Sequence, residues 1–248
     1  MLSSLKNYIK SKPRLYDKFN AYRPLQSETE KWLNYFSIAN KKSVQFIQIG
    51  ANDGLRWDPV RRFITRDGWS GILVEPLPQA FTLLKKNYAH IKHNNLVFVN
   101  AAISSNNENL HLWSFSESFL NKLSIEDRFF YLRKSSLNKK IVISHLKGLD
   151  NIDEKIKCFN IKCISINSLV EKFWKHNEID LIVIDAEGHD ANIIRSINFQ
   201  IICPKAILYE SHNLGDDKQR INGFLKDKGY NVYDLGGDSV AEYAVAPK

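Results

Sequence analysis

The stretch FIQIGANDG at residues 46–54 is a short apolar run that ends in a polar loop bracketed by two glycines. A second apolar run, GILVE at residues 71–75, ends at Glu75. Runs of this kind are typical of parallel strands buried on both faces, whose carboxyl ends open on one edge of a sheet. Gly50 permits a tight turn where a side chain would block a ligand. The two runs therefore predict an α/β fold with a nucleotide pocket between neighbouring strand ends.

The position of Glu75 and the chemistry of the loop narrow down the nucleotide. Glu75 lies 21 residues after Gly54, where such folds place the carboxylate that binds ribose hydroxyls. The loop lacks the third glycine of GxGxxG, and the carboxylate of Asp53 would repel a diphosphate. A carboxylate at this position suits a ligand with an ammonium or sulfonium group, and this favours S-adenosylmethionine over NAD. The alternative is an ordinary strand–turn–helix connection without a ligand.

The composition indicates one α/β domain with an appendage. The chain has 248 residues, 44% of them hydrophobic and 12% aromatic, which supplies a sizeable core. No run of about 18 apolar residues occurs, so we expect no membrane-spanning helix. The segment Met1–Lys12 lacks a continuous apolar stretch and does not predict a secretory signal. The scattered cysteines Cys158, Cys163 and Cys203 show no metal spacing and indicate reduced thiols in a cytoplasmic protein.

The chain is basic, with a formal net charge of +8 and a pI of about 9.2. Lysine and arginine gather in residues 1–24 and again between Arg133 and Lys147. Such patches attract nucleic acid, anionic lipid or an acidic glycan. No interleaved aromatic residues and no nucleic-acid-binding motif accompany them. We therefore interpret them as a solvated basic face and do not expect a nucleic-acid partner.

Helical spacing predicts an N-terminal helical extension over residues 1–41, ahead of an α/β domain over residues 42–248. The apolar face of its first part is formed by Leu2, Leu5 and Ile9. Its second part follows the cap-like Ser27 and repeats apolar residues at Trp32, Phe36 and Ala39. The extension either only packs on the domain, covers a substrate site, or joins copies of the chain into a homo-oligomer.

From residue 44 onward the pattern alternates between strands and helices. The predicted strands are 44–49, 71–75, 96–100, 161–164, 181–184, 206–209, 230–235 and 239–246. The predicted helices are 56–66, 77–88, 167–174, 191–197 and 216–227. The Gly236-Gly237 turn predicts a C-terminal antiparallel hairpin, which a dehydrogenase half-fold does not require.

Residues 104–160 interrupt this alternation. They are polar and contain one apparent short strand at 109–113. A long insertion inside a compact domain is usually functional or mobile. Because it follows the third strand, we expect this insertion beside the mouth of the nucleotide pocket, where it would cover a substrate.

Four stretches of the chain resemble the FkbM family of S-adenosylmethionine-dependent methyltransferases. They are FIQIGANDG at 46–54, GILVEP at 71–76, VNAAIS at 99–104 and IDLIVIDAEGHD at 179–190, in family order. The resemblance spans residues 44 to about 246 and implies the Rossmann-like, seven-stranded sheet of class I methyltransferases. It also implies S-adenosylmethionine as the methyl donor and a hydroxyl of a sugar, glycan or small natural product as the acceptor.

The resemblance assigns cofactor contacts to the ends of the first three strands. The methionine portion would be surrounded by Gly50, Ala51, Asn52 and Asp53. Glu75 would hold the ribose, and Pro76 would shape the turn beside the adenine. The adenine edge would be lined by Asn100, Ala101 and Ala102, although this stretch also fits a simple strand exit.

Ionisable side chains gather after two later strands, first Asp185, Glu187 and His189 with Asp190 beside them, then Glu210 and His212. Parallel strand ends share one edge, so we expect both groups to face one crevice. His189 would remove the proton from the attacking hydroxyl, with His212 as the second candidate and Glu187 or Glu210 as the orienting carboxylate. Asp185 would position the methyl-bearing end of the cofactor or the acceptor; alternatively, Asp185 or Asp190 caps the next helix.

Several alternatives stay open. Asp185, Glu187, Glu210 and His212 could hold a divalent metal ion, but no spacing motif demands one, so we predict none. The leading hypothesis is an O-methyltransferase that carries out base-assisted in-line transfer to a small molecule or glycan. The competing hypotheses are an RNA methyltransferase and a non-catalytic binding or assembly protein with a retained pocket. The intact glycine loop and Glu75 argue against the last.

Overall fold

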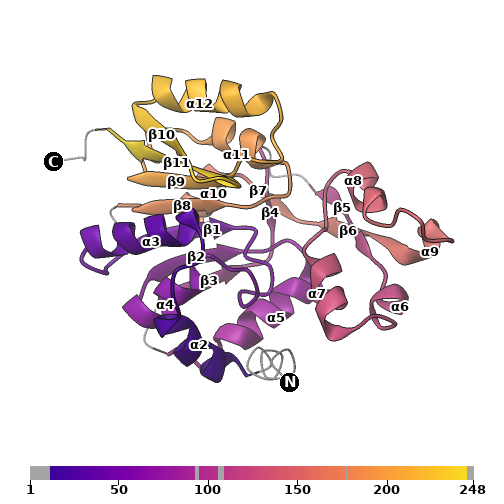
Figure 1. The fold of residues 1–248 in the computed structure, drawn as a ribbon. Helices are drawn as coiled ribbons and strands as arrows, with labels where there is room; N and C mark the ends of the chain where they lie inside the picture. Colours follow the sequence, from indigo (N-terminus) through magenta and orange to yellow (C-terminus); the bar gives the residue numbers. More distant parts are fainter. Residues whose placement is uncertain (1–11, 93–94, 106–108, 177, 245–248) are drawn as a thin grey trace.

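A sheet of seven strands forms the centre of the molecule (Figure 1). The structure is a computed structural model that describes residues 12–244 apart from 93–94, 106–108 and 177, so the predicted face of Leu2, Leu5 and Ile9 lies outside the described residues. In spatial order the strands are β10 (Tyr230–Asp234), β11 (Asp238–Tyr243), β9 (Ala206–Glu210), β8 (Leu181–Ile184), β1 (Gln45–Ile49), β2 (Ser70–Val74) and β3 (Leu96–Val99). Strand β11 runs antiparallel to the other six strands. The predicted seven-stranded sheet with a C-terminal antiparallel hairpin is confirmed.

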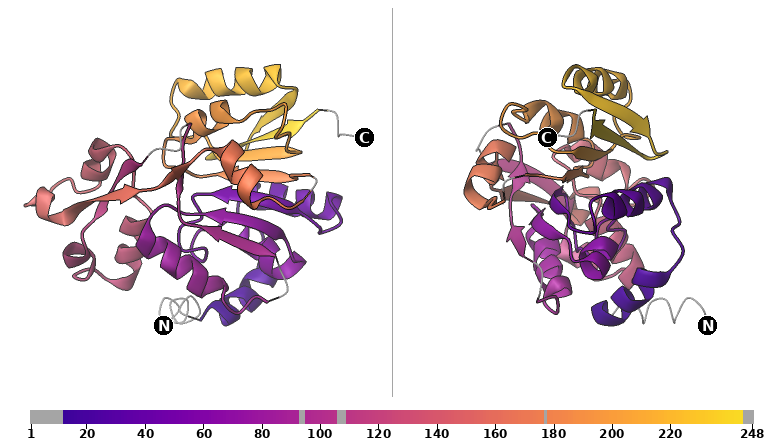
Figure 2. Two further views of the ribbon diagram at one scale, coloured as in Figure 1. Left: turned by 180° about the vertical axis from the view of Figure 1, so that it is seen from behind. Right: turned by 90° about the vertical axis from the view of Figure 1, so that its left-hand side faces the viewer.

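Helices cover both faces of the sheet and give three layers, which Figure 1 and Figure 2 show from different sides. One face is covered by α10 (Ile166–Phe173), α11 (Asp190–Ser196) and α12 (Asp217–Asp227). The other is covered by α3 (Glu28–Ala39), α4 (Arg61–Asp67) and α5 (Pro78–Tyr88). Alternate residues of each strand point to opposite faces, so Ile47 and Ile49 enter the first core and Phe46 the second. Each such buried side chain stabilises the fold by about 1.5–3 kcal/mol.

The N-terminal extension packs on its own chain. Helix α2 (Pro13–Tyr22) lies against α4, and α3 begins after Ser27, whose hydroxyl accepts a hydrogen bond from the Glu30 N–H at 3.1 Å. Helix α3 is fastened to β11 by the Thr29 hydroxyl and the Trp32 indole, which donate to Asp238 at 2.6 Å and Glu242 at 2.8 Å. Among the described helices, none has the length and apolar character needed to cross a membrane.

The insertion predicted at 104–160 has its own small core and extends from one side of the sheet, as Figure 2 shows. Strand β5 (Leu110–Phe115) pairs antiparallel with β6 (Ile156–Ile161). Between them lie α6 (Glu117–Leu120), α7 (Ile125–Leu132), α8 (Lys139–Ser144) and α9 (Ile152–Lys155). At its base β4 (Ala102–Ile103) pairs in parallel with β7 (Cys163–Ile164). The single strand predicted over 161–164 is wrong, because Lys162 separates two strands with different partners.

The helix predicted over 56–66 begins five residues later than expected, at Arg61. Residue 57 has a left-handed backbone with a φ of 56°, and Pro59 disfavours a helical conformation at the residue before it. The Asp58 carboxylate accepts hydrogen bonds from the N–H groups of Val60 and Arg61 at 3.0 and 3.2 Å, which marks the actual helix start. Residues 51–60 therefore form an extended loop instead of a helical turn.

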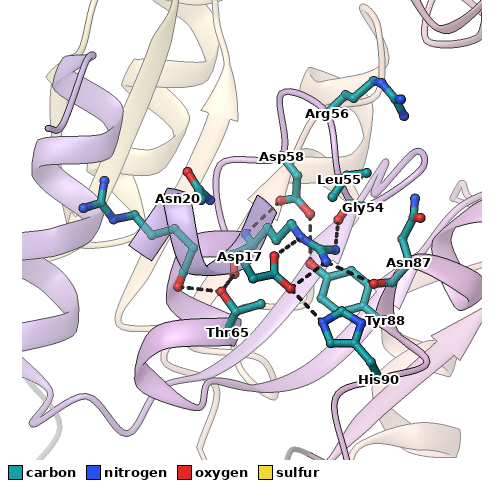
Figure 3. Close-up of polar contacts among 12 residues, drawn as sticks. Asp17, Asn20, Gly54, Leu55, Arg56, Asp58, Thr65, Asn87, Tyr88 and His90 are labelled. Atoms are coloured by element: carbon teal, nitrogen blue, oxygen red, sulfur yellow. Dashed lines mark hydrogen bonds and ion pairs between the residues drawn. The ribbon is translucent and has the colours of Figure 1, made fainter. Parts of the chain in front are cut away.

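A buried ion-pair network holds this loop from behind. The Arg61 guanidinium is fully buried and donates to Asp17 of α2, at 2.7 and 3.0 Å, to the Gly54 carbonyl and to the Asn87 carbonyl at 3.0 Å. The His90 ring lies 2.8 Å from the same Asp17 carboxylate, and Figure 3 shows Asp17 and His90 next to each other below Gly54. The N-terminal extension is thereby connected to the loop through one carboxylate.

We expect Asp17→Asn to lower the free energy of unfolding by about 3 kcal/mol or more, because it leaves the buried Arg61 guanidinium without its charge partner. Urea unfolding measures the loss. The matched control is Asp153→Asn, whose carboxylate is 92% exposed and 3.5 Å from Lys139, and which we expect to change stability by less than about 0.5 kcal/mol. Equal effects of the two substitutions would contradict the role given to Asp17.

Candidate active site

A cavity with about 1040 Å³ of empty space, part of it open to solvent, lies at the carboxyl ends of β1, β2 and β8, and we call it the first cavity. Most of the residues predicted to bind the cofactor line it: residues 50–53, Glu75, Pro76, Ala101, Ala102 and Asp185. The insertion closes it from the other side with residues that include Phe129 and Arg133. The predicted strand-end pocket and the insertion therefore lie together.

Gly50 shapes the first cavity through backbone packing. Its φ is 83°, and a Cβ atom there would lie 1.8 Å from the Asp185 carbonyl oxygen. Its N–H and that of Ala51 both donate to the Val74 carbonyl at 3.0 Å. Glycine is thus required because the backbone at Asp185, directly after β8, crowds this turn. From the sequence we expected a side chain at position 50 to clash with a ligand. In the structure it would clash with the Asp185 carbonyl group.

Glu75 is only 6% exposed and presents a carboxylate to the first cavity. Its two oxygens accept hydrogen bonds from the N–H groups of Asn52 and Leu77, each at 2.8 Å. Burial raises the pKa of this carboxyl to about 7, although both N–H groups favour the charged form. Each oxygen keeps acceptor capacity for one further hydroxyl, which suits a vicinal diol.

Asp53 has a different role from the one predicted. Its carboxylate accepts the N–H groups of Leu55 and Arg56, both at 2.9 Å, and pairs with the Arg56 guanidinium at 2.9 Å. The side chain is therefore neutralised within the loop that it shapes, and its charge does not select a cationic ligand. An arginine three residues later was the sequence signal for this pair.

Asn100 does not line the first cavity. Its amide donates to the carbonyl groups of Glu75 and Pro76 at 2.8 and 3.0 Å. It supports the turn that carries Glu75, whereas the neighbouring Ala101 and Ala102 line the cavity itself.

Two further observations indicate that the first cavity is built for a ligand. The Oε1 atom of Gln48, a residue that lines it, is buried without a hydrogen-bond partner. Three non-glycine residues around it, Asn52, Trp57 and Glu187, have positive φ angles of 46°, 56° and 46°. Such conformations cost about 1–3 kcal/mol each and gather at functional sites.

The carboxylates predicted to gather after β8 do not all face the first cavity. Asp185 and Glu187 line the first cavity, and Lys134 of the insertion lies 3.2 Å from both Glu187 oxygens. Burial, reinforced by Glu210 and Glu187, raises the pKa of Asp185 well above its usual value. Asp190 is fully buried at the first residue of α11 and accepts a hydrogen bond from the Ala186 N–H at 3.4 Å. The helix-cap alternative is not confirmed for it, because His189 precedes the helix and its side chain makes no capping hydrogen bond. Burial raises the pKa of Asp190 to about 7.

The two histidines do not face one crevice, which corrects the prediction. His189 lines the first cavity, and its Nδ1 atom lies 3.2 Å from the Asn192 amide. His212 and Glu210 line an adjoining hollow, the second cavity, where the Nδ1 of His212 lies 3.6 Å from a Glu210 oxygen. Asp185 lines both cavities. In the part of the chain that the structure describes, no group of three His, Cys, Asp or Glu side chains is arranged to hold a metal ion.

The wall between the cavities was not predicted. It includes Trp57 and Arg133, which line both cavities, with the Arg133 guanidinium 4.9 Å from the centre of the Trp57 ring. Arg56 lies over the Phe129 ring at 3.5 Å. These contacts dock the insertion onto the loop after β1. No local pattern indicates them, because each joins residues more than seventy positions apart.

Comparison with solved structures finds similar chains at low sequence identity. The FkbM methyltransferase of Methylobacillus flagellatus KT is 11% identical, with 82% of this chain and 44% of that chain covered and a TM-score of 0.44. This chain thus spans less than half the length of that protein. The methyltransferase domain of METTL16 is 11% identical, with 90% and 71% covered and a TM-score of 0.47. The N-terminal domain of human METTL16 in complex with SAH is 12% identical, with 89% and 72% covered and a TM-score of 0.42.

No curated protein sequence matches the chain. The family model of the methyltransferase FkbM domain matches residues 48–232. That range begins within β1, ends within β10 and contains the glycine turn, Glu75 and Asp185. The match covers most of the chain, and the chain therefore belongs to the FkbM methyltransferase family.

Proposed function

We propose that the chain is an S-adenosylmethionine-dependent O-methyltransferase that acts on a hydroxyl of a sugar, a glycan or a small natural product. The observation that carries this proposal is the buried Glu75 carboxylate, held by the N–H groups of Asn52 and Leu77 beside the glycine turn. It offers paired acceptors to the two hydroxyls of a ribose. Family membership supports methyl transfer, and the choice of oxygen as the acceptor atom is part of the proposal.

The residues of the first cavity fit this cofactor. Glu75 would bind the ribose, the turn at residues 50–52 would receive the amino-acid end, and Ala101 and Ala102 leave a smooth apolar surface for the adenine. The unpartnered Gln48 oxygen would accept a hydrogen bond from the ligand. When bound, S-adenosylmethionine supplies a methyl group on a positively charged sulfur.

The chain's own residues would hold the acceptor and take its proton. Asp185 lines both cavities and would accept a hydrogen bond from the acceptor hydroxyl where the cavities meet. Burial lowers the pKa of His189, so its imidazole is neutral near pH 7 and free to take a proton. His212, with Glu210 beside it, is the second candidate base.

Neither competing function is favoured by a specific observation. An RNA methyltransferase would need cations free to bind phosphates near the strand ends. Carboxylates from β8 and β9 lie there, and two of the three nearby arginines, Arg23 and Arg56, are paired with Glu30 and Asp53.

An assembly protein working through its N-terminal helices would need these to present a free face. Helices α2 and α3 contact their own domain through Asp17, Thr29 and Trp32. They leave Tyr35 and Ile38 of α3 exposed. The intact pocket at the Gly50 turn, and not the packing of these helices, argues against this function.

Binding of S-adenosylhomocysteine, measured by calorimetry, tests the cofactor site. We expect micromolar binding to the intact chain and a loss of at least about 100-fold in Glu75→Ala, since two hydrogen bonds to a charged acceptor disappear. Glu28→Ala removes a carboxylate whose side chain is 63% exposed and should bind like the intact protein. An intact chain that does not bind S-adenosylhomocysteine would sink the proposal.

The raised pKa of Glu75 makes stability depend on pH. Between pH 4.5 and about 7 the folded protein holds a proton on Glu75 that the unfolded chain has released, so this group's contribution to stability falls as pH rises. Glu75→Gln removes that fall. We expect the unfolding free energy of the variant, relative to wild type, to rise by about 3 kcal/mol between pH 4.5 and pH 8 in urea titrations. A difference that stays constant with pH would contradict this.

The proposed base is tested with radiolabelled methyl transfer to a panel of methyl glycosides. We expect His189→Gln to lower kcat by about 10²–10⁴-fold while S-adenosylhomocysteine affinity stays unchanged. The acidic limb of the wild-type pH–rate profile should lie below pH 6.5, because burial lowers the pKa of His189 from that value. If His212→Gln causes the larger loss of kcat, the assignment passes to His212.

A further inference from the structure

The second cavity has no role in holding the proposed cofactor. It encloses about 1950 Å³, part of it open to solvent, beside the first cavity. The N-terminal extension supplies one wall, with Tyr16 and Phe19 on α2 and Thr29 on α3. The ends of β8, β9 and β11 supply the floor. Trp57 and Asp185 border both cavities, so a molecule in the second cavity lies next to one in the first.

Carboxylates from three adjacent strands lie along the floor. Asp185 follows β8, Glu210 ends β9, and Asp238 begins β11 directly opposite Glu210 in the strand register. The Thr29 hydroxyl donates to Asp238 at 2.6 Å, and the Asn213 amide donates to Glu210 at 2.9 Å. Burial, with repulsion from Glu210, raises the pKa of both Asp185 and Asp238. The floor thus offers acceptor and donor oxygens to hydroxyl groups. Glu210, whose charge acts on both neighbouring carboxyls, repels a negatively charged ligand.

The guanidinium groups that line the second cavity are engaged by neighbours. Arg23 pairs with Glu30 within the extension. Arg56 pairs with Asp53 at 2.9 Å. Arg133 lies over the Trp57 ring at 4.9 Å. The ion pairs neutralise Arg23 and Arg56, whereas the ring contact leaves the charge of Arg133 in place. One guanidinium group therefore stands beside the three carboxylates of the floor.

Aromatic rings complete the lining. Phe19 is 55% exposed, and both Tyr16 and Trp57 present ring surface to the same cavity. Flat rings provide large, rigid contact area at low entropic cost, and they pack well on the C–H face of a sugar ring. A lining of aromatic faces and carboxyl oxygens matches the alternating apolar and hydroxyl surfaces of a carbohydrate.

We propose that the second cavity is the acceptor site and that it takes a hydroxyl-rich, uncharged acceptor, excluding one that carries a phosphate or carboxylate. This inference rests on the proposed function, because the first cavity must hold the methyl donor. The N-terminal extension, which supplies one wall of the second cavity, lies outside the matched residues 48–232. Any reaction that phosphorylates the same acceptor must then act after methylation.

Saturation-transfer NMR with methyl α-D-glucoside, methyl α-D-mannoside, methyl α-L-rhamnoside and glucose 6-phosphate tests this, with and without saturating S-adenosylhomocysteine. We expect at least one neutral glycoside to bind, and glucose 6-phosphate to bind at least about tenfold more weakly. Phe19→Ala should weaken glycoside binding by about fivefold or more. Tyr22→Ala is the matched control on the same helix, 88% exposed and outside the cavity, and should stay within about twofold.

The outcomes separate the acceptor site from the cofactor site. Glycoside binding that depends on Phe19 and not on Tyr22 supports the proposal, as does recovery of glucose 6-phosphate binding in a Glu210→Gln/Asp238→Asn variant. Absence of glycoside binding, indifference to Phe19→Ala, or equal binding of the phosphate overturns it. Failure of S-adenosylhomocysteine to bind would instead overturn the cofactor assignment, while the glycoside measurement without it still decides the acceptor site.

Discussion

The active-site region depends on the close approach of two backbone segments, the turn at Gly50 and the carbonyl group of Asp185. The 1.8 Å separation between that oxygen and a Cβ atom built at position 50 leaves no room for a side chain. The Gly50 N–H also donates to Val74 of β2 at 3.0 Å, and the Asp185 N–H donates to Ile49 at 3.0 Å. Backbone contacts therefore fix three strand ends to one another, and Glu75 and Asp185 take their spacing from them.

Charged side chains are arranged differently on the two sides of the loop at residues 51–60, toward the core and toward the first cavity. On the core side, the buried Arg61 is fully satisfied by Asp17 and two carbonyl groups, which makes a rigid support. On the cavity side, Asp185 and Glu187 are pushed toward their neutral forms by burial and by neighbouring carboxylates. A rigid, satisfied network beneath perturbed groups is the arrangement that holds reactive side chains in place.

The sequence predicted the centre of the sheet well because β1, β2, β8 and β9 are short apolar runs whose ends are marked by a glycine or an acidic residue. It placed Glu75 correctly for the same reason, since strand-end spacing is a local property. It missed the division into two cavities, which depends on the left-handed backbone of Trp57 and on its contact with Arg133, residues far apart in sequence. It also placed the start of α4 too early, because the predicted range began before Pro59, and the helix begins only at Arg61.

The hydrogen bonds from α3 to β11 join residues 209 and 210 positions apart. Contacts of this separation close only when nearly the whole chain is present, and they form slowly. Strand β9 also waits for β11, which lies between it and β10. During synthesis, helix α3 and the sheet edge at β9 therefore stay uncovered until the C-terminal hairpin emerges. The two ends of the chain complete the fold in one late step, and the wall and floor of the second cavity appear together.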